Sequence, residues 1–253
     1  MTGIPRGHSI HTKRIKYRIV VLAILLLSVI IREVYLIKYP VPARDSFEYV
    51  HFFYEWEKTK TIPLDRAFPP IAMMLLQFPH RLFGVELIKG GILLNFILGL
   101  CIVYLVCRTT KLITKSNLCV LLVGGMAATN PSLVHYSCQF LRDNIYLFFC
   151  SLCIVKSTEL CYRYKFVTLL EIAFFSSMAY LSRHEGIELF LIEITVLLFL
   201  KNVSVLKKAR IIFLYCLLCA VCFGAVLLIS GLDISYYSVI FERKYFYLLE
   251  LNG

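Results

Sequence analysis

The sequence predicts an all-α integral membrane protein, a bundle of about seven transmembrane helices with further helices at the membrane interface. Of the 253 residues, 59 % are hydrophobic, and the mean hydropathy is +0.76, whereas soluble domains are about 45–50 % apolar. Apolar runs recur along the chain, separated by short polar connections. The net charge of +11 fits this class, because basic residues gather in cytoplasmic loops of membrane proteins. It implies no nucleic-acid partner.

The first apolar run, Ile19 to Ile31, carries no charge and follows a basic N-terminal segment, residues 1–16. Such an arrangement predicts a signal anchor with its N-terminus in the cytoplasm. Val41-Pro42-Ala43 resembles a signal-peptidase site but lies far beyond the apolar run, so no cleavage is expected.

The stretch Phe68 to Phe83 decides the topology of everything that follows. It is shorter than the roughly 20 residues that a spanning helix needs, and Gln77, Pro79, His80 and Arg81 interrupt it. If it does not cross, all later basic clusters fall on the N-terminal side, as the positive-inside rule requires. We therefore expect an interfacial or re-entrant helix within an external loop, residues 40–88.

Six further spans complete the predicted count of seven. Together they form a membrane module over residues 17–230. An external tail, residues 231–253, follows it. The spans are Gly90 to Cys107, Leu118 to Tyr136, Asn144 to Val155, Phe166 to Leu181, Ile187 to Leu200, and Ile211 to Ser230. The basic clusters between them are Arg108, Lys111 and Lys115; Lys156, Arg163 and Lys165; and Lys201, Lys207, Lys208 and Arg210.

The opposite, external side carries charged residues that the positive-inside rule does not explain. If residues 44–58 form a helix, the carboxylates of Asp45, Glu48 and Glu55 lie near one face of it. The external set is Arg44, Asp45, Glu48 and Glu55 in the first loop, with Tyr49 beside them, His135, Arg142 and Asp143 in the second, and Arg183, His184 and Glu185 in the third.

This external set has two interpretations. Ionisable residues are expensive beside lipid, so their convergence predicts a binding or catalytic site. Alternatively, Arg142 with Asp143, and Arg183 with Glu185, form local ion pairs that cap helix ends.

In their order along the chain, these motifs resemble the N-terminal membrane module of the GT-C glycosyltransferases. The likeness covers about residues 17–230 and is closest to the bacterial aminoarabinose, galacturonosyl and protein O-mannosyl transferases. The motifs are Asp45 with Tyr49, the Pro69-Pro70 helix ending in Leu82-Phe83-Gly84, Asn130-Pro131, Arg142-Asp143, and Arg183-His184-Glu185-Gly186.

The resemblance implies an inverting glycosyltransferase. The enzyme would move a sugar from a polyprenyl-phosphate donor to a lipid, glycan or protein acceptor on the external face of the bacterial inner membrane. Asp45 matches the family's first acid, a base or acceptor-positioning residue, and Asp143 matches its second. Arg142, Arg183 and Arg66 are candidates to hold the leaving phosphate, because a guanidinium binds phosphate bidentately.

Among the remaining members of the external set, Arg44, Glu48, Tyr49, His135, His184 and Glu185 are expected to bind substrate. Some relatives hold a divalent metal, so the resemblance leaves a metal between Asp45, Asp143 and a histidine open, although the sequence contains no compact ligand motif.

Three alternatives remain beside the enzyme. GT-C enzymes are commonly longer, so a truncated fragment or a module that needs a partner is one of them. A non-catalytic membrane subunit would tolerate replacement of Asp45. A lipid or sugar transporter would carry ionisable residues near the bilayer midplane and internal repeats.

Overall fold

The computed structural model describes residues 7–59, 70–200 and 203–230, and within these ranges it contains helices and no strand, which confirms the all-α prediction. The helices are α1 (Gly7–Lys38), α2 (Arg44–Thr59), α3 (Pro70–Phe83), α4 (Leu87–Thr114), α5 (Asn117–Thr129), α6 (Pro131–Ser137), α7 (Asp143–Tyr162), α8 (Phe166–Ser182), α9 (Gly186–Leu198) and α10 (Val205–Ser230).

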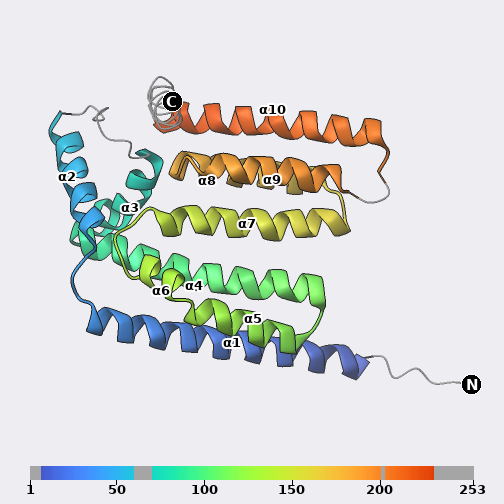
Figure 1. Ribbon diagram of the computed structural model, residues 1–253, viewed down its shortest axis with the longest axis horizontal. Coiled ribbons are helices and arrows are strands. Elements are labelled where there is room, and N and C mark those ends of the chain that lie inside the picture. The colour runs from blue at the N-terminus through green and yellow to red at the C-terminus, as the bar shows by residue number, and fades with distance from the viewer. Residues whose placement is uncertain (1–6, 60–69, 201–202, 231–253) are drawn as a thin grey trace, which may run out of the picture.

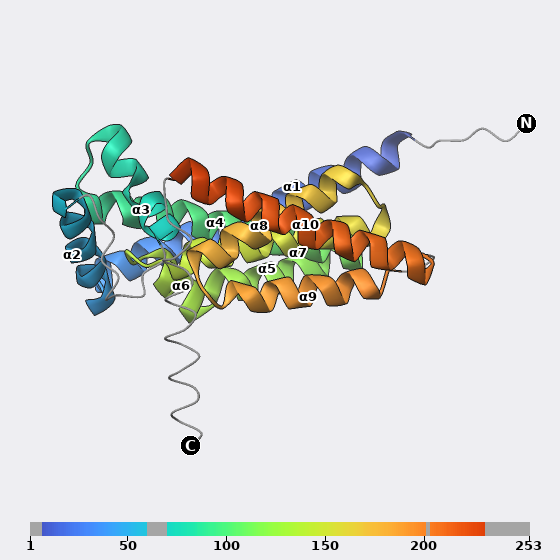
Figure 2. The ribbon, with the colours of Figure 1, turned by 90° about the horizontal axis from the view of Figure 1, so that it is seen from above.

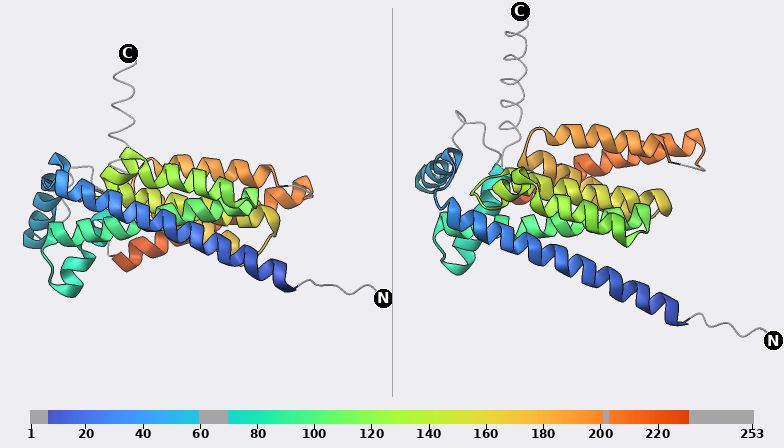
Figure 3. Two further views of the ribbon diagram at one scale, coloured as in Figure 1. Left: turned by 90° about the horizontal axis from the view of Figure 1, so that it is seen from below. Right: turned by 60° about the horizontal axis from the view of Figure 1, so that its bottom comes forward.

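The helices form an elongated bundle, and α2 and α3 lie together at the end away from the N-terminus (Figure 1). Helix α1 packs on α4 and α5, α4 packs on α7, α7 on α8, and α8 on both α9 and α10. As a result, α1 lies at one edge of the bundle, and α9 and α10 lie at the other (Figure 3).

Among the described residues, four helices are long and apolar enough to cross a membrane: α1 from Lys16, α4, α7, and α10 as far as Ile229. The pair α5 and α6 makes a fifth if it is counted as one span. Helix α8 is apolar but only 17 residues long. The membrane class is therefore supported by length and composition, while the count of seven spans stays a prediction.

The predicted span Leu118 to Tyr136 is divided in the structure, because α5 and α6 meet at an angle of 57°. Proline has no backbone N–H to donate and its ring clashes with the preceding turn, so it kinks or breaks a helix interior but is favoured in the first turn. Pro131 instead starts α6, and the side chain of Asn130 caps it by accepting a hydrogen bond from the Leu133 amide at 3.0 Å.

Helix α3 contains 14 residues and is not among the candidate spans of the described residues; its interfacial or re-entrant position stays a prediction. It packs on α4 and α8 and buries Ile71, Met73 and Leu76. Residues 60–69, which include Arg66, lie outside the described residues, as does the predicted tail, residues 231–253.

Arg32 of α1 is fully buried, although the sequence places it near the outer end of the first span. Its Nε donates to Ser137 Oγ at 2.7 Å, and its Nη1 donates to the carbonyl and the hydroxyl oxygens of Ser28. A buried polar group without partners costs about 1–3 kcal/mol. The bond to Ser137 joins α1 to α6, while the bonds to Ser28 stay within α1.

Two glycines test how tightly the bundle packs. A Cβ on Gly91 of α4 would lie 2.1 Å from Cδ2 of Phe140, a fully buried ring, whereas a Cβ on Gly125 of α5 would meet nothing within 4 Å. We expect Gly91→Ala to lower the free energy of unfolding by about 1–3 kcal/mol through overpacking. Gly125→Ala, the control, should be neutral or raise it by up to about 1 kcal/mol. Denaturant unfolding in detergent micelles measures both, and equal effects would contradict this packing.

Candidate functional site

The three motif groups that the sequence assigns to the external side lie at one end of the bundle. Helix α2, the connection from α6 to α7 and the turn from α8 to α9 all lie at the end away from the N-terminus (Figures 1 and 2). The connections from α4 to α5 and from α7 to α8 lie at the N-terminal end (Figure 1). The structure thus separates the mixed-charge motifs from the basic ones, and the membrane face that each end occupies stays a prediction.

Arg183, which follows α8, is the centre of a charged cluster. Its Nη1 donates to Oδ1 of Asp143, a residue 40 positions away at the start of α7. Its Nε donates to Oε2 of Glu185 at 2.9 Å, and its guanidinium lies 5.9 Å from the ring centroid of Tyr146. The expected local pair of Arg183 with Glu185 is therefore present, but it is part of a larger contact between α7 and the α8–α9 turn.

The cluster is half-buried: the exposed side-chain fractions are 17 % for Asp143 and 32 % for Arg183. Burial disfavours the charge on Arg183, but the carboxylates of Asp143 and Glu185 outweigh it and raise the pKa of Arg183 above its usual range. Arg183 is therefore a fixed cation that keeps partial access to solvent.

The local sequence explains why these side chains meet. Asp143 lies in the first turn of α7, where the negative charge of a carboxylate interacts favourably with the helix dipole. The α8–α9 turn closes on Gly186, at which a Cβ would lie 2.4 Å from the Tyr180 nitrogen. Only glycine permits this close approach. The tight turn that results places Arg183 and Glu185 close to the start of α7.

Tyr49 connects α2 with the charged cluster. It is 3 % exposed, and its ring centroid lies 6.4 Å from that of Phe140. Burial raises the pKa of Tyr49 to about 12, and Asp45, Arg142, Asp143 and Arg183 are all near enough to contribute to its electrostatic field. Asp45 itself is exposed in the first turn of α2.

Buried amides hold the backbone beneath the cluster. Asn95 Nδ2 donates to the carbonyl oxygens of Gln139 and Leu141 at 2.7 and 2.8 Å, and Asn144 Nδ2 donates to the carbonyl oxygen of Asn95 at 2.6 Å. The Ala43 amide donates to Oε1 of Gln139 at 2.6 Å, which joins the first loop to the same network. The sequence analysis missed this network; its only signal was an asparagine within the apolar run of α4.

The other predicted site residues contribute less to the cluster. Nδ1 of His135 lies 2.7 Å from the Tyr35 hydroxyl of α1, and the ring of His184 lies 6.4 Å from that of Tyr180. Arg44 is exposed and Glu48 is half-buried. Among the carboxylates of α2, Oε1 of Glu55 lies 3.1 Å from Nε2 of His51.

The donor set does not fit a divalent metal. No three histidine, cysteine, aspartate or glutamate side chains gather as ligands among the residues that the structure describes. Asp143, which the metal interpretation requires, is already engaged by Arg183.

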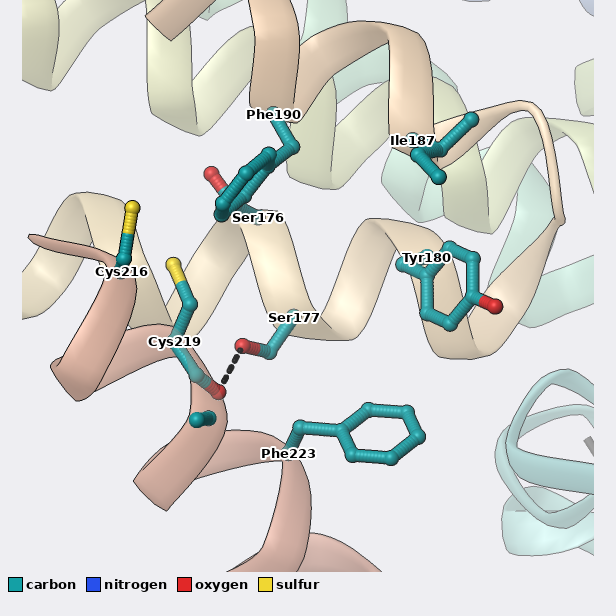
Figure 4. A pocket seen from close by; sticks show the side chains of 10 residues that line it. Ser176, Ser177, Tyr180, Ile187, Phe190, Cys216, Cys219 and Phe223 are labelled. Carbon is teal, nitrogen blue, oxygen red and sulfur yellow. Dashed lines mark hydrogen bonds between the residues drawn. The ribbon is translucent and has the colours of Figure 1, made fainter. Parts of the chain in front are cut away.

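An apolar cavity of about 380 Å³, which no sequence pattern predicted, lies between α8, α9 and α10 (Figure 4). Tyr180, Ile187, Phe190, Cys216 and Phe223 line it. Tyr180 and Gly186, which also lines it, each stand three residues from Arg183 in the chain. One end of the cavity therefore lies next to the turn that carries the charged cluster.

No protein-family model matches this chain, and no curated protein or solved structure matches it.

The contact of Arg183 with Asp143 can be tested by a double-mutant cycle of Arg183→Gln and Asp143→Asn. Half-buried, charge-assisted hydrogen bonds predict a coupling free energy of about 1–3 kcal/mol in unfolding experiments. The control cycle uses Lys89→Gln and Glu86→Gln, a pair whose side chains are 75 % and 59 % exposed. Its coupling should be the weaker of the two, because water screens the attraction between exposed charges. A weaker coupling for Arg183 and Asp143 than for the control would refute the cluster.

Proposed function

We propose that this protein is a membrane glycosyltransferase that takes a sugar from a polyprenyl-phosphate donor. The observation that carries this proposal is that the half-buried charged cluster around Arg183 lies beside an apolar cavity. A lipid-linked sugar phosphate needs both features, a cation for its phosphate and an apolar surface for its chain. The motif resemblance to the GT-C glycosyltransferases supports the same assignment.

The reaction that suits this site is a single inverting displacement. An acceptor hydroxyl or amine attacks the anomeric carbon, the bond from that carbon to the phosphate oxygen breaks, and polyprenyl phosphate leaves with the electron pair. A carboxylate near the acceptor takes its proton as the new bond forms. The negative charge that develops on the phosphate is stabilised by guanidinium groups that are already in position.

Asp45 is the better candidate for the base. It is exposed in the first turn of α2, and it lies near the buried Tyr49, to whose electrostatic field Arg183 also contributes. Asp143 is engaged with Arg183, so we assign to it the positioning of that guanidinium. Arg183 and Arg142 then bind the leaving phosphate, with hydrogen bonds that strengthen as its charge grows.

The donor's chain is assigned to the cavity between α8, α9 and α10. In this arrangement the seven helices other than α2, α3 and α6 cross the membrane, with α6 completing the span that α5 begins. The N-terminus and the basic loops lie in the cytoplasm, and the charged cluster faces the external side.

A non-catalytic subunit is the second candidate, because the contacts of Asp143 and Glu185 with Arg183 also stabilise the fold. It differs from the enzyme in one respect: binding of the lipid donor would persist without any transfer, and replacement of Asp45 would change nothing.

Sugar transfer from radiolabelled polyprenyl-phosphate sugars, in membranes that contain the chain, tests the assignment. We expect Asp45→Asn to lower the rate of transfer by about 10²–10⁴-fold, the usual contribution of a general base, and to leave donor binding intact. Asp143→Asn should weaken donor binding as well, because it releases Arg183.

The control for these variants is Glu57→Gln, which removes an exposed carboxylate from the opposite end of α2. It should leave transfer unchanged. Donor binding without transfer by the unaltered chain would favour the non-catalytic subunit, and the absence of both would reject the proposal.

The cavity is tested by filling it. Ala220 lines the cavity from α10, so Ala220→Phe should raise KM for the lipid donor about tenfold while kcat changes less than twofold. Val221→Phe is the control, because Val221 is 59 % exposed on the same helix and does not line the cavity. If both changes raised KM equally, the cavity would not be the binding site of the donor's chain.

A further inference from the structure

Two hollows lie at the N-terminal end of the bundle, away from the charged cluster. The first, of about 490 Å³, is bounded by the ends of α4 and α7 and by the start of α8. The second, of about 480 Å³, lies between the α7–α8 turn and the first two turns of α10.

Both hollows are lined by cations. Lys115, Arg163 and Lys165 line the first, and Lys207 and Arg210 line the second. Within the described part of the chain, none of these five side chains pairs with a carboxylate. The single acidic residue among the lining side chains, Glu159, is engaged by Arg108 and Lys156.

The two hollows share the α7–α8 turn. Arg163 and Lys165 line the first hollow, and Tyr164 between them lines the second. Helix α8 starts after Lys165 without a side-chain cap, so the amide hydrogens of its first turn add to the positive potential of the turn.

The lining is amphipathic as well as basic. Leu206, Ile211 and Leu214 accompany the cations of the second hollow, and Leu112 accompanies those of the first. Tyr162 and Tyr164 are 62 % and 41 % exposed, and tyrosines of this kind are typical of the membrane–water boundary. Basic residues that only orient the protein in the membrane would need neither hollows nor apolar residues around them.

We propose that these two hollows bind the phosphodiester head groups of anionic phospholipids, with the acyl chains against the apolar sides of α8 and α10. Basic pockets between transmembrane helices are a recognised form of such sites, and each lysine or arginine near a membrane surface adds to the attraction for anionic lipids. This inference does not depend on the proposed transfer reaction.

The test uses the full chain in neutral-detergent micelles, titrated with phosphatidylglycerol and with phosphatidylcholine and followed by native mass spectrometry. We expect two phosphatidylglycerol molecules to bind tightly and phosphatidylcholine to bind at least tenfold more weakly. The double variant Arg163→Gln with Lys165→Gln, and the double variant Lys207→Gln with Arg210→Gln, should each weaken one of the two sites at least tenfold.

The matched control is Lys16→Gln with Arg18→Gln, which removes two exposed cations of α1 that line neither hollow. It should leave both sites within about twofold. Equal losses in the control, or equal binding of the two lipids, would overturn the proposal. A third titration with glycerol phosphate distinguishes a lipid from a soluble anion, and binding as tight as that of phosphatidylglycerol would also overturn it.

Discussion

The contact between Arg183 and Asp143 is the constraint on which the candidate site depends. It joins the start of α7 to the turn between α8 and α9, across 40 residues of chain. Both charges are partly withdrawn from water, so each requires the other, and breaking such a pair from one side leaves an uncompensated charge. This pairing of Arg183 with Asp143 positions the turn. Tyr180 and Gly186, at that turn, line one side of the apolar cavity.

The same logic applies inside the bundle, where polar groups meet no water. Arg32 donates to Ser28 and Ser137, and the Asn95 amide donates to carbonyl groups of the α6–α7 connection. The bonds of Asn95 attach the irregular backbone of that connection to α4. The connection that presents Asp143 is therefore held rigidly from below, which is the condition for a preorganised binding site.

The two ends of the bundle differ in the balance of their charges. At the end with α2, Arg183 pairs with Asp143 and Glu185, and Asp143 and Arg183 contribute to the electrostatic field at the buried Tyr49. At the N-terminal end, five cations that pair with no carboxylate of the described residues line two hollows. Paired charges suit a site that must bind and release a charged reactant, whereas unpaired cations attract a permanently anionic partner such as an acidic membrane surface. The asymmetry gives each end a separate chemistry.

Composition and the spacing of apolar runs determined the helical membrane class and nearly every helix, because periodic hydrophobicity is a local property of the chain. The same signals located Asp143, Arg183 and Glu185 as charges at helix ends. Only the tertiary structure decided that Asp143 pairs with Arg183, that Arg32 and Asn95 bind partners far along the chain, and that a cavity separates α8, α9 and α10. Each of these depends on which helix faces lie together, and that is set by packing between distant segments.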